Sequence, residues 1–171
     1  SSIDSSITIS GNSEIKNNKT SNTESSQFSQ NVYLNDQNYY NKHNTVYVSD
    51  SLKNKNSVGI TLPEGPGIFG YSYSGNINDN AKCFFSDNEK YSVGSDDKSN
   101  LILGYSVKVD ADPNVSKGKV EANRSLGVYI PKEQVTLSVV PEDGYVLSDN
   151  TLKAVNVETE EEIALTPQET K

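Results

Sequence analysis

The sequence predicts an all-β fold, and three observations support this prediction. Short segments alternate apolar and polar residues, and each ends at residues that favour turns. No window of useful length repeats its apolar residues with the period of an α-helix. Only 33% of the 171 residues are hydrophobic, and the mean hydropathy is −0.65. Because this apolar supply is thin, we expect two small or elongated units rather than one large core.

The first part of the chain, dense in Asn and Ser, contains a series of short predicted strands. Each alternating segment is closed by Asn, Asp, Gly or Pro, and two short apolar runs fit strands that are buried. The predicted strands are Ser6–Ser10, Asn31–Leu34, Thr45–Val48, Ser57–Leu62, Cys83–Phe85 and Asn100–Leu103.

The composition shifts near Gly104 toward Val, Glu and Lys, and strand alternation becomes stronger. Gln134–Val139 alternates strictly, which predicts Val135, Leu137 and Val139 on one face. The remaining predicted strands are Tyr105–Val109, Lys119–Ala122, and a hairpin of Lys153–Val157 with Glu162–Thr166. Five or six strands in so short a span predict a small, mainly antiparallel sandwich or grasp-like sheet. We therefore divide the chain into residues 1–103, residues 104–166 and a tail at 167–171.

Charge and hydropathy exclude two classes of partner. The formal net charge is −8, the isoelectric point is near 4.6, and Arg124 is the only arginine. A phosphate backbone would be repelled, so nucleic-acid binding is not expected. No stretch approaches the 18 apolar residues of a membrane span. The chain contains no Met and shows no signal peptide, and we expect it to be a segment of a longer protein.

No catalytic constellation is found in the sequence. His43, the only histidine, lies in a polar stretch and is expected to be an ordinary loop residue. Cys83, the only cysteine, can form no intramolecular disulfide, and its neighbour Phe84 predicts a buried thiol. The acidic runs Asp96–Asp97 and Glu160–Glu162 are expected to be solvated. We therefore predict no catalytic residue and no cofactor.

One calcium-like spacing and two tyrosine pairs are candidate binding sites. Asp110, Asp112, Asn114 and Glu121 have the spacing of calcium-loop ligands. However, Val115 occupies the position that needs glycine, so no metal site is predicted. Tyr39–Tyr40 and Tyr71-x-Tyr73 are candidates for stacking on sugars, although tyrosine is also an ordinary strand residue.

Several segments resemble the end of a right-handed parallel β-helix from Gram-positive surface proteins. The residues that carry the resemblance are Thr8-Ile9-Ser10-Gly11-Asn12, Asn31-Val32-Tyr33-Leu34, Ser57-Val58-Gly59-Ile60-Thr61, the segment from Phe84 to Tyr91, and Asn100-Leu101-Ile102-Leu103. The resemblance implies that residues 1–103 form the C-terminal coils and cap, and such a cap needs apolar residues to plug the last coil. The expected plug residues are Val58, Ile60, Phe84 and Phe85, and Asn12, Asn17 and Asn18 are expected to stack inward in ladders.

Residues 104–166 resemble a divergent internalin-type bacterial B-repeat. Tyr105–Val109, Gly118–Val120 and above all Gln134–Tyr145 carry this second resemblance. Together the two resemblances imply a non-enzymatic structural or interaction module of a cell-surface or secreted bacterial protein, located in the cell wall or outside the cell. The partner is not identified, but a glycan or a surface protein of a host or neighbouring cell fits such a module, including an adhesin that binds by strand addition.

An alternative is an accessory region of an extracellular carbohydrate-active β-helix enzyme. Such enzymes, as a family, cluster acidic residues on one solenoid face, and the lyases add calcium and a basic residue. Here only one Asp, Asp4, precedes the capping stretch, and the single arginine, Arg124, lies in the other part of the chain. Catalytic coils would therefore have to lie upstream of this chain.

Overall fold

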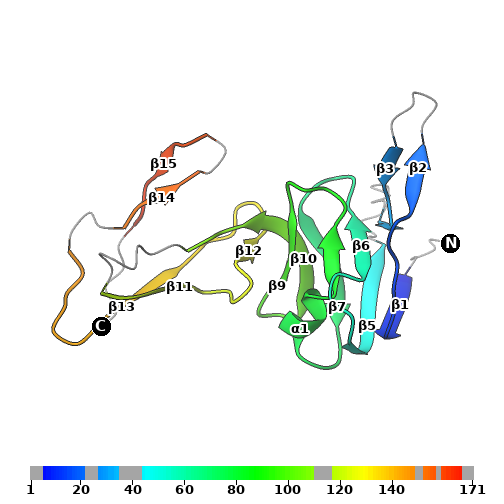
Figure 1. The fold of residues 1–171 in the computed structure, drawn as a ribbon, viewed down its shortest axis with the longest axis horizontal. Helices are drawn as coiled ribbons and strands as arrows, with labels where there is room; N and C mark the ends of the chain where they lie inside the picture. Colours follow the sequence, from blue (N-terminus) through cyan, green and yellow to red (C-terminus); the bar gives the residue numbers. More distant parts are fainter. Residues whose placement is uncertain are drawn as a thin grey trace. The chain divides into compact units, whose positions relative to one another are not determined.

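The computed structural model describes residues 6–21, 27–34, 44–109, 117–148, 152–156 and 159–166. These residues form mostly β-strands with one short helix, which confirms the all-β class. The chain divides into two compact units (Figure 1). The first comprises residues 1–109 and 122–137, and the second comprises residues 110–121 and 138–171.

The larger sheet of the first unit begins with parallel strands and ends with antiparallel ones (Figure 1). Its strands, in spatial order, are β1 (Ser6–Gly11), β5 (Thr45–Leu52), β7 (Gly67–Ser72), β10 (Asn100–Ser106) and β12 (Val128–Tyr129), with β9 (Ser92–Ser95) also paired to β10. The pairs β1–β5 and β5–β7 are parallel, whereas β10 is antiparallel to β7, β9 and β12.

A second sheet contains β4 (Val32–Tyr33), β6 (Val58–Thr61) and β8 (Phe84–Ser86), all parallel. Ile15 adds an isolated parallel bridge to Val58. The chain passes alternately between the two sheets, from β5 to β6, then to β7 and β8. Successive passes are roughly two dozen residues apart, since Val46 pairs with Gly70 and Val58 with Phe84. A hairpin of β2 (Lys19–Ser21) and β3 (Gln27–Ser29) interrupts the first pass.

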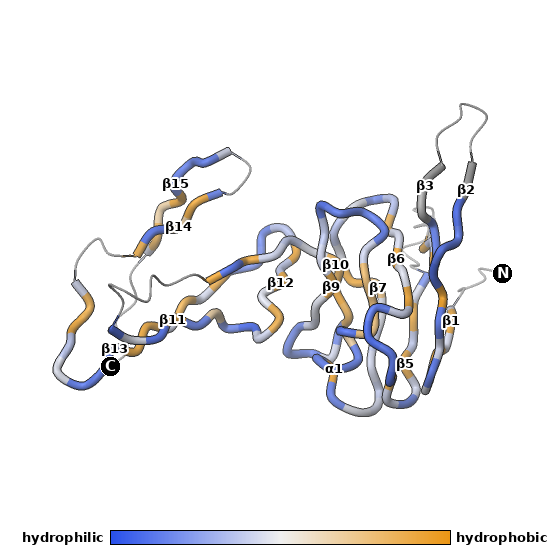
Figure 2. Tube along the Cα trace, viewed as in Figure 1, coloured by the Kyte–Doolittle hydropathy of each residue, from blue (hydrophilic) through white to orange (hydrophobic). Residues whose placement is uncertain are grey.

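The core of the first unit lies where the two sheets face each other. Val46, Val48 and Phe69 of the larger sheet are buried together with residues of the second sheet. The Phe69 and Phe84 rings pack edge to face, with centroids 5.3 Å apart. Figure 2 shows hydrophobic residues recurring along β5, β7 and β10. This arrangement follows from strand alternation, which turns every second side chain inward.

The residues expected to plug a last coil lie in β6 and β8, and most of them are buried. Val58 and Ile60 are fully buried and Phe84 is almost so, whereas Phe85 is only partly buried. Cys83 is buried in the same core, which confirms the expected buried thiol.

The helix α1 (Ile77–Ala81) was not expected from the sequence. Its N-cap, Asn76, accepts hydrogen bonds from the backbone N–H groups of Asn78 and Asp79. The buried Asn80 accepts from the Leu52 N–H at 2.9 Å and donates to Ser72 Oγ and the Ser74 carbonyl. Because the helix is only five residues long, it cannot produce a helical repeat in the sequence.

The prediction that Asn12, Asn17 and Asn18 stack inward is wrong, because all three are exposed. Asn18 nevertheless joins a polar chain across the second sheet, since it donates to Asn31 Oδ1 through its backbone N–H at 2.9 Å and through Nδ2 at 3.3 Å. Asn31 donates to Asp87 through Nδ2 at 2.6 Å and through its backbone N–H at 3.0 Å. Thr61 Oγ1 donates to the same carboxylate at 2.8 Å. Gly59 leaves the space for this chain, since a Cβ there would lie 2.3 Å from Asn31 Nδ2.

The expected join near Gly104 falls inside a strand. β10 runs from Asn100 to Ser106, so the separate strands predicted on each side of Gly104 are one strand. A Cβ at Gly104 would lie 2.4 Å from the Tyr129 carbonyl oxygen, because β12 returns to pair with β10. The two compact units therefore divide at other positions, and the boundary between a capping region and a repeat stays a prediction.

Two small two-stranded sheets lie mostly in the second unit. β11 (Gly118–Ala122) pairs with β13 (Leu137–Pro141). The predicted hairpin is confirmed, because β14 (Ala154–Val155) is antiparallel to β15 (Glu162–Ile163). The strand predicted from Gln134 begins only at Leu137. Val135 is exposed, whereas Leu137 and Val139 are partly buried.

Candidate functional site

The strand register brings three tyrosines together on the outer face of the larger sheet. Tyr47 on β5 lies directly opposite Tyr71 on β7, and Tyr73 follows two residues later. Val46 and Val48 point into the core, so alternation places Tyr47 on the opposite face. We call Tyr47, Tyr71 and Tyr73 the tyrosine ladder.

The rings of the ladder stack nearly parallel. The Tyr47 centroid lies 6.0 Å from that of Tyr71, with 21° between the ring planes. It lies 5.5 Å from that of Tyr73, with an angle of 15°. Tyr71 is 37% exposed and Tyr73 is 72% exposed, whereas Tyr47 is partly buried. Within the described part of the chain, none of the three hydroxyl groups has a hydrogen-bond partner.

The positions that flank the ladder are polar but uncharged. By register, Thr8 on β1 lies opposite Tyr47, and Asn100 on β10 lies opposite Tyr71. Exposed ring faces can stack on apolar C–H groups, and phenol hydroxyls can donate or accept hydrogen bonds. The ladder therefore offers an uncharged surface for a ligand that carries both apolar C–H groups and hydrogen-bonding groups.

The sequence predicts part of this site. Tyr71 and Tyr73 are its candidates for stacking on sugars, and the structure places both rings against Tyr47. Tyr47 was missed, because only the parallel register of β5 and β7 brings it opposite Tyr71. Tyr39 and Tyr40, the other candidate pair, lie outside the described residues.

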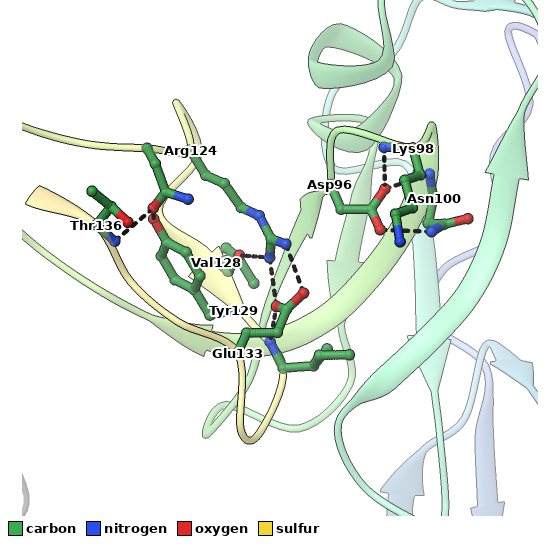
Figure 3. A network of polar contacts seen from close by, with 10 residues as sticks. Asp96, Lys98, Asn100, Arg124, Val128, Tyr129, Glu133 and Thr136 are labelled. Carbon is green, nitrogen blue, oxygen red and sulfur yellow. Dashed lines mark hydrogen bonds and ion pairs between the residues drawn. The ribbon is translucent and has the colours of Figure 1, made fainter.

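A second polar cluster holds the returning segment of residues 123–136 in place (Figure 3). Arg124 donates from both terminal nitrogens to Glu133, at 2.6 Å each, and Nη1 also donates to the Val128 carbonyl at 3.1 Å. The Ile130 N–H donates to Glu133 at 2.8 Å. The Arg124 guanidinium lies 4.9 Å from the centre of the Tyr129 ring.

The electrostatics of this cluster favour a fixed ion pair. The hydrogen bonds from Arg124 lower the pKa of the Glu133 carboxyl, and the same bonds raise the pKa of Arg124. Burial raises the pKa of Tyr129, whose hydroxyl donates to Asn123 at 2.8 Å. Since Arg124 and Glu133 are engaged with each other, the cluster is suited to holding β12 against β10 rather than to binding a ligand.

The acidic runs are only partly as expected. Asp97 and Glu160–Glu162 are exposed, but Asp96 is partly buried and organises a turn. Asp96 accepts from the Lys98 N–H at 2.9 Å and from Asn100 Nδ2 at 2.6 Å, as Figure 3 shows.

The other candidates for chemistry gain no support from the structure. His43 and the calcium-like residues Asp110, Asp112 and Asn114 lie outside the described residues. Among the residues that are described, no group of three or more His, Cys, Asp or Glu side chains could hold a metal ion. Burial raises the pKa of the Cys83 thiol. The described part of the chain also contains no helix long and apolar enough to cross a membrane.

Described residues of the first unit line two open hollows. One, of about 460 Å³, is lined by Lys55, Lys82, Phe85, Tyr91 and Leu126 among others. The other, of about 380 Å³, lies beside Tyr71. Leu34 and Asn44 are among the residues that line it. Residues 35–43, which separate these two in the sequence, lie outside the described residues.

No protein-family model, no curated protein and no solved structure matches this chain.

Proposed function

We propose that the chain is a non-catalytic structural and interaction module of a bacterial cell-surface or secreted protein. The first unit is the end of a parallel solenoid, and the residues that follow begin a stalk of repeats. The observation that carries this proposal is the alternation of parallel strands between two sheets, with β1, β5 and β7 in one and β4, β6 and β8 in the other.

The end of the first unit supports the assignment of a cap. A solenoid coil contacts only its neighbours, so the last coil would leave apolar side chains and a sheet edge exposed. Here the parallel order gives way to antiparallel β9 and β10. Leu101 and Leu103 join the core, and Ile102 is buried as well. An antiparallel pair that covers the last coil is what such an end requires.

The cluster around Arg124 supports the stalk assignment. The chain leaves the first unit after Val109, returns for residues 122–137, and leaves again. The returning segment is held by the Arg124–Glu133 ion pair and by β12 pairing with β10. A returning segment that is held within the first unit by an ion pair and by strand pairing suits a module that spaces and presents its neighbours.

The test of this proposal is the location of the parent protein. Intact cells of the source organism are treated briefly with trypsin, and the released peptides are identified by mass spectrometry. The proposal expects peptides of this chain in the released fraction, without peptides of cytosolic marker proteins. Recovery of these peptides only after cell lysis would refute a surface location.

The alternative, an accessory region of a carbohydrate-active enzyme, is separated by an activity assay. The parent protein and this chain are incubated with a panel of plant and bacterial polysaccharides, and released reducing ends and unsaturated products are measured. Depolymerisation by the parent protein, with none by the chain, would favour the alternative. No product from either would favour the structural module.

A further inference from the structure

We propose that the tyrosine ladder binds a neutral glycan. Pyranose rings would stack on Tyr73 and Tyr71, and their hydroxyl groups would hydrogen-bond with the phenol oxygens. The inference rests on the proposed function, since a module outside the cell meets glycan chains.

Tyr73 is the most exposed residue of the tyrosine ladder. Its ring stacks on Tyr47 at 5.5 Å with an angle of 15°, so one face is used within the protein. The residue nevertheless remains 72% exposed. A ring that is stacked on one side and still so exposed presents its other face to solvent. An aromatic face with a fixed orientation binds apolar C–H groups at little entropic cost.

The tyrosine ladder also has hydrogen-bonding capacity that the described residues do not use. The hydroxyls of Tyr47, Tyr71 and Tyr73 have no partner within the described residues. Each phenol oxygen can both donate and accept. Apolar ring faces beside such groups match a sugar ring, which presents C–H groups on its faces and hydroxyls around its edge.

Charge favours a neutral glycan over an acidic one. The register places Thr8 and Asn100 on either side of the two paired tyrosines, so no cation lies in that row, and the buried Asn100 side chain donates to the Asp96 carboxylate at 2.6 Å. The whole chain carries a formal charge of −8, which repels polyanions at long range. An acidic polysaccharide would therefore need cations that the ladder does not supply.

The competing explanation is that the ladder only stabilises the sheet. Stacked aromatic pairs contribute about 0.5–1.5 kcal/mol beyond their burial, and cross-strand pairs are a usual source of sheet stability. That explanation accounts for the stacking but predicts no saturable binding of sugars. The two explanations are therefore separated by a titration.

The experiment titrates the full chain with cellohexaose and chitohexaose, and with a galacturonic acid hexamer as the acidic probe, by isothermal calorimetry. We expect at least one neutral hexamer to bind and the acidic hexamer not to bind. Tyr73→Ala is expected to weaken binding about thirtyfold, equal to about 2 kcal/mol. Tyr73→Phe keeps the ring and is expected to bind within about threefold of the original chain.

The matched control is Tyr33→Ala, because Tyr33 is also an exposed tyrosine of the first unit, 46% exposed on β4. It is expected to leave binding unchanged. The inference is overturned if no neutral hexamer binds, if the acidic hexamer binds better, or if Tyr33→Ala weakens binding as much as Tyr73→Ala. None of these results would change which peptides trypsin releases from intact cells, so the glycan site and the surface location can be refuted separately.

Discussion

Replacing Glu133 with alanine should destabilise the first unit strongly, because this carboxylate organises the returning segment. Glu133 accepts two hydrogen bonds of 2.6 Å from Arg124 and one of 2.8 Å from the Ile130 N–H. The side chains of Arg124 and Glu133 are only 12% and 25% exposed. Removing one partner of a fully buried pair costs about 3–5 kcal/mol, whereas an exposed pair contributes about 0–1 kcal/mol. Since this pair retains some solvent contact, we expect Glu133→Ala to lower the free energy of unfolding by about 3 kcal/mol.

The cost arises mainly from the arginine that is left behind. Arg124 Nε is already buried without a hydrogen-bond partner among the described residues. Loss of Glu133 would leave the two terminal nitrogens with only the Val128 carbonyl as a partner in this cluster. Reduced pairing of a partly desolvated cation is more costly than the absence of both charges.

The assay is urea unfolding followed by circular dichroism, combined with amide hydrogen exchange at Val128 and Tyr129. The control is Glu162→Ala, which removes an exposed ion pair with Lys153 at 3.5 Å and should change stability by less than about 0.5 kcal/mol. Glu133→Ala should also accelerate exchange in β12. A loss below about 1 kcal/mol, or unchanged exchange at Tyr129, would refute the role assigned to this ion pair.

The same carboxylate makes stability depend on pH. Hydrogen bonds from Arg124 hold the pKa of Glu133 below its ordinary value in the folded protein. The stabilisation is therefore fully present above the pKa of the unfolded chain and is lost as the pH falls through the lower folded pKa. Between about pH 6 and pH 3, the urea midpoint should fall more steeply for the original chain than for Glu133→Gln. Parallel curves for the two proteins would contradict this assignment.

Three further predictions concern the core and the second sheet. Phe84→Ala should cost about 3–5 kcal/mol in urea unfolding, and Phe85→Ala clearly less, because Phe84 is 2% exposed and Phe85 is only partly buried. Gly59→Ala should lower the free energy of unfolding by about 2 kcal/mol and shift the amide signals of Asn31, because the new Cβ displaces the Asn31 side chain. The control is Gly67→Ala, since a Cβ at Gly67 would have no neighbouring atom within 4 Å. Cys83 should resist iodoacetamide in the folded protein and react in urea, because burial raises the pKa of its thiol; rapid alkylation of the folded chain, seen by mass spectrometry, would show that the thiol is accessible.

The parts of the fold that local pattern encodes were predictable. The segments around Ile7, Val46 and Ile60 alternate and end at turn residues, and each forms a strand close to its expected place. The pattern did not predict β7, because Pro66, Gly67 and Gly70 weaken it. This strand forms because it lies between β5 and β10. Position 70 accepts only glycine, because a Cβ there would lie 2.4 Å from the Val46 carbonyl oxygen.

The all-β class, the buried thiol, the short hairpin near the C-terminus and the acidic charge could all be predicted from the amino-acid sequence. These properties depend on composition and on residues close to one another in the chain. Tertiary structure alone decided which strands pair, that Asn31 rather than Asn12 joins a polar chain across the second sheet, and that Tyr47 meets Tyr71. Strand register joins residues far apart in sequence, and it is set by packing of the whole sheet rather than by any local pattern.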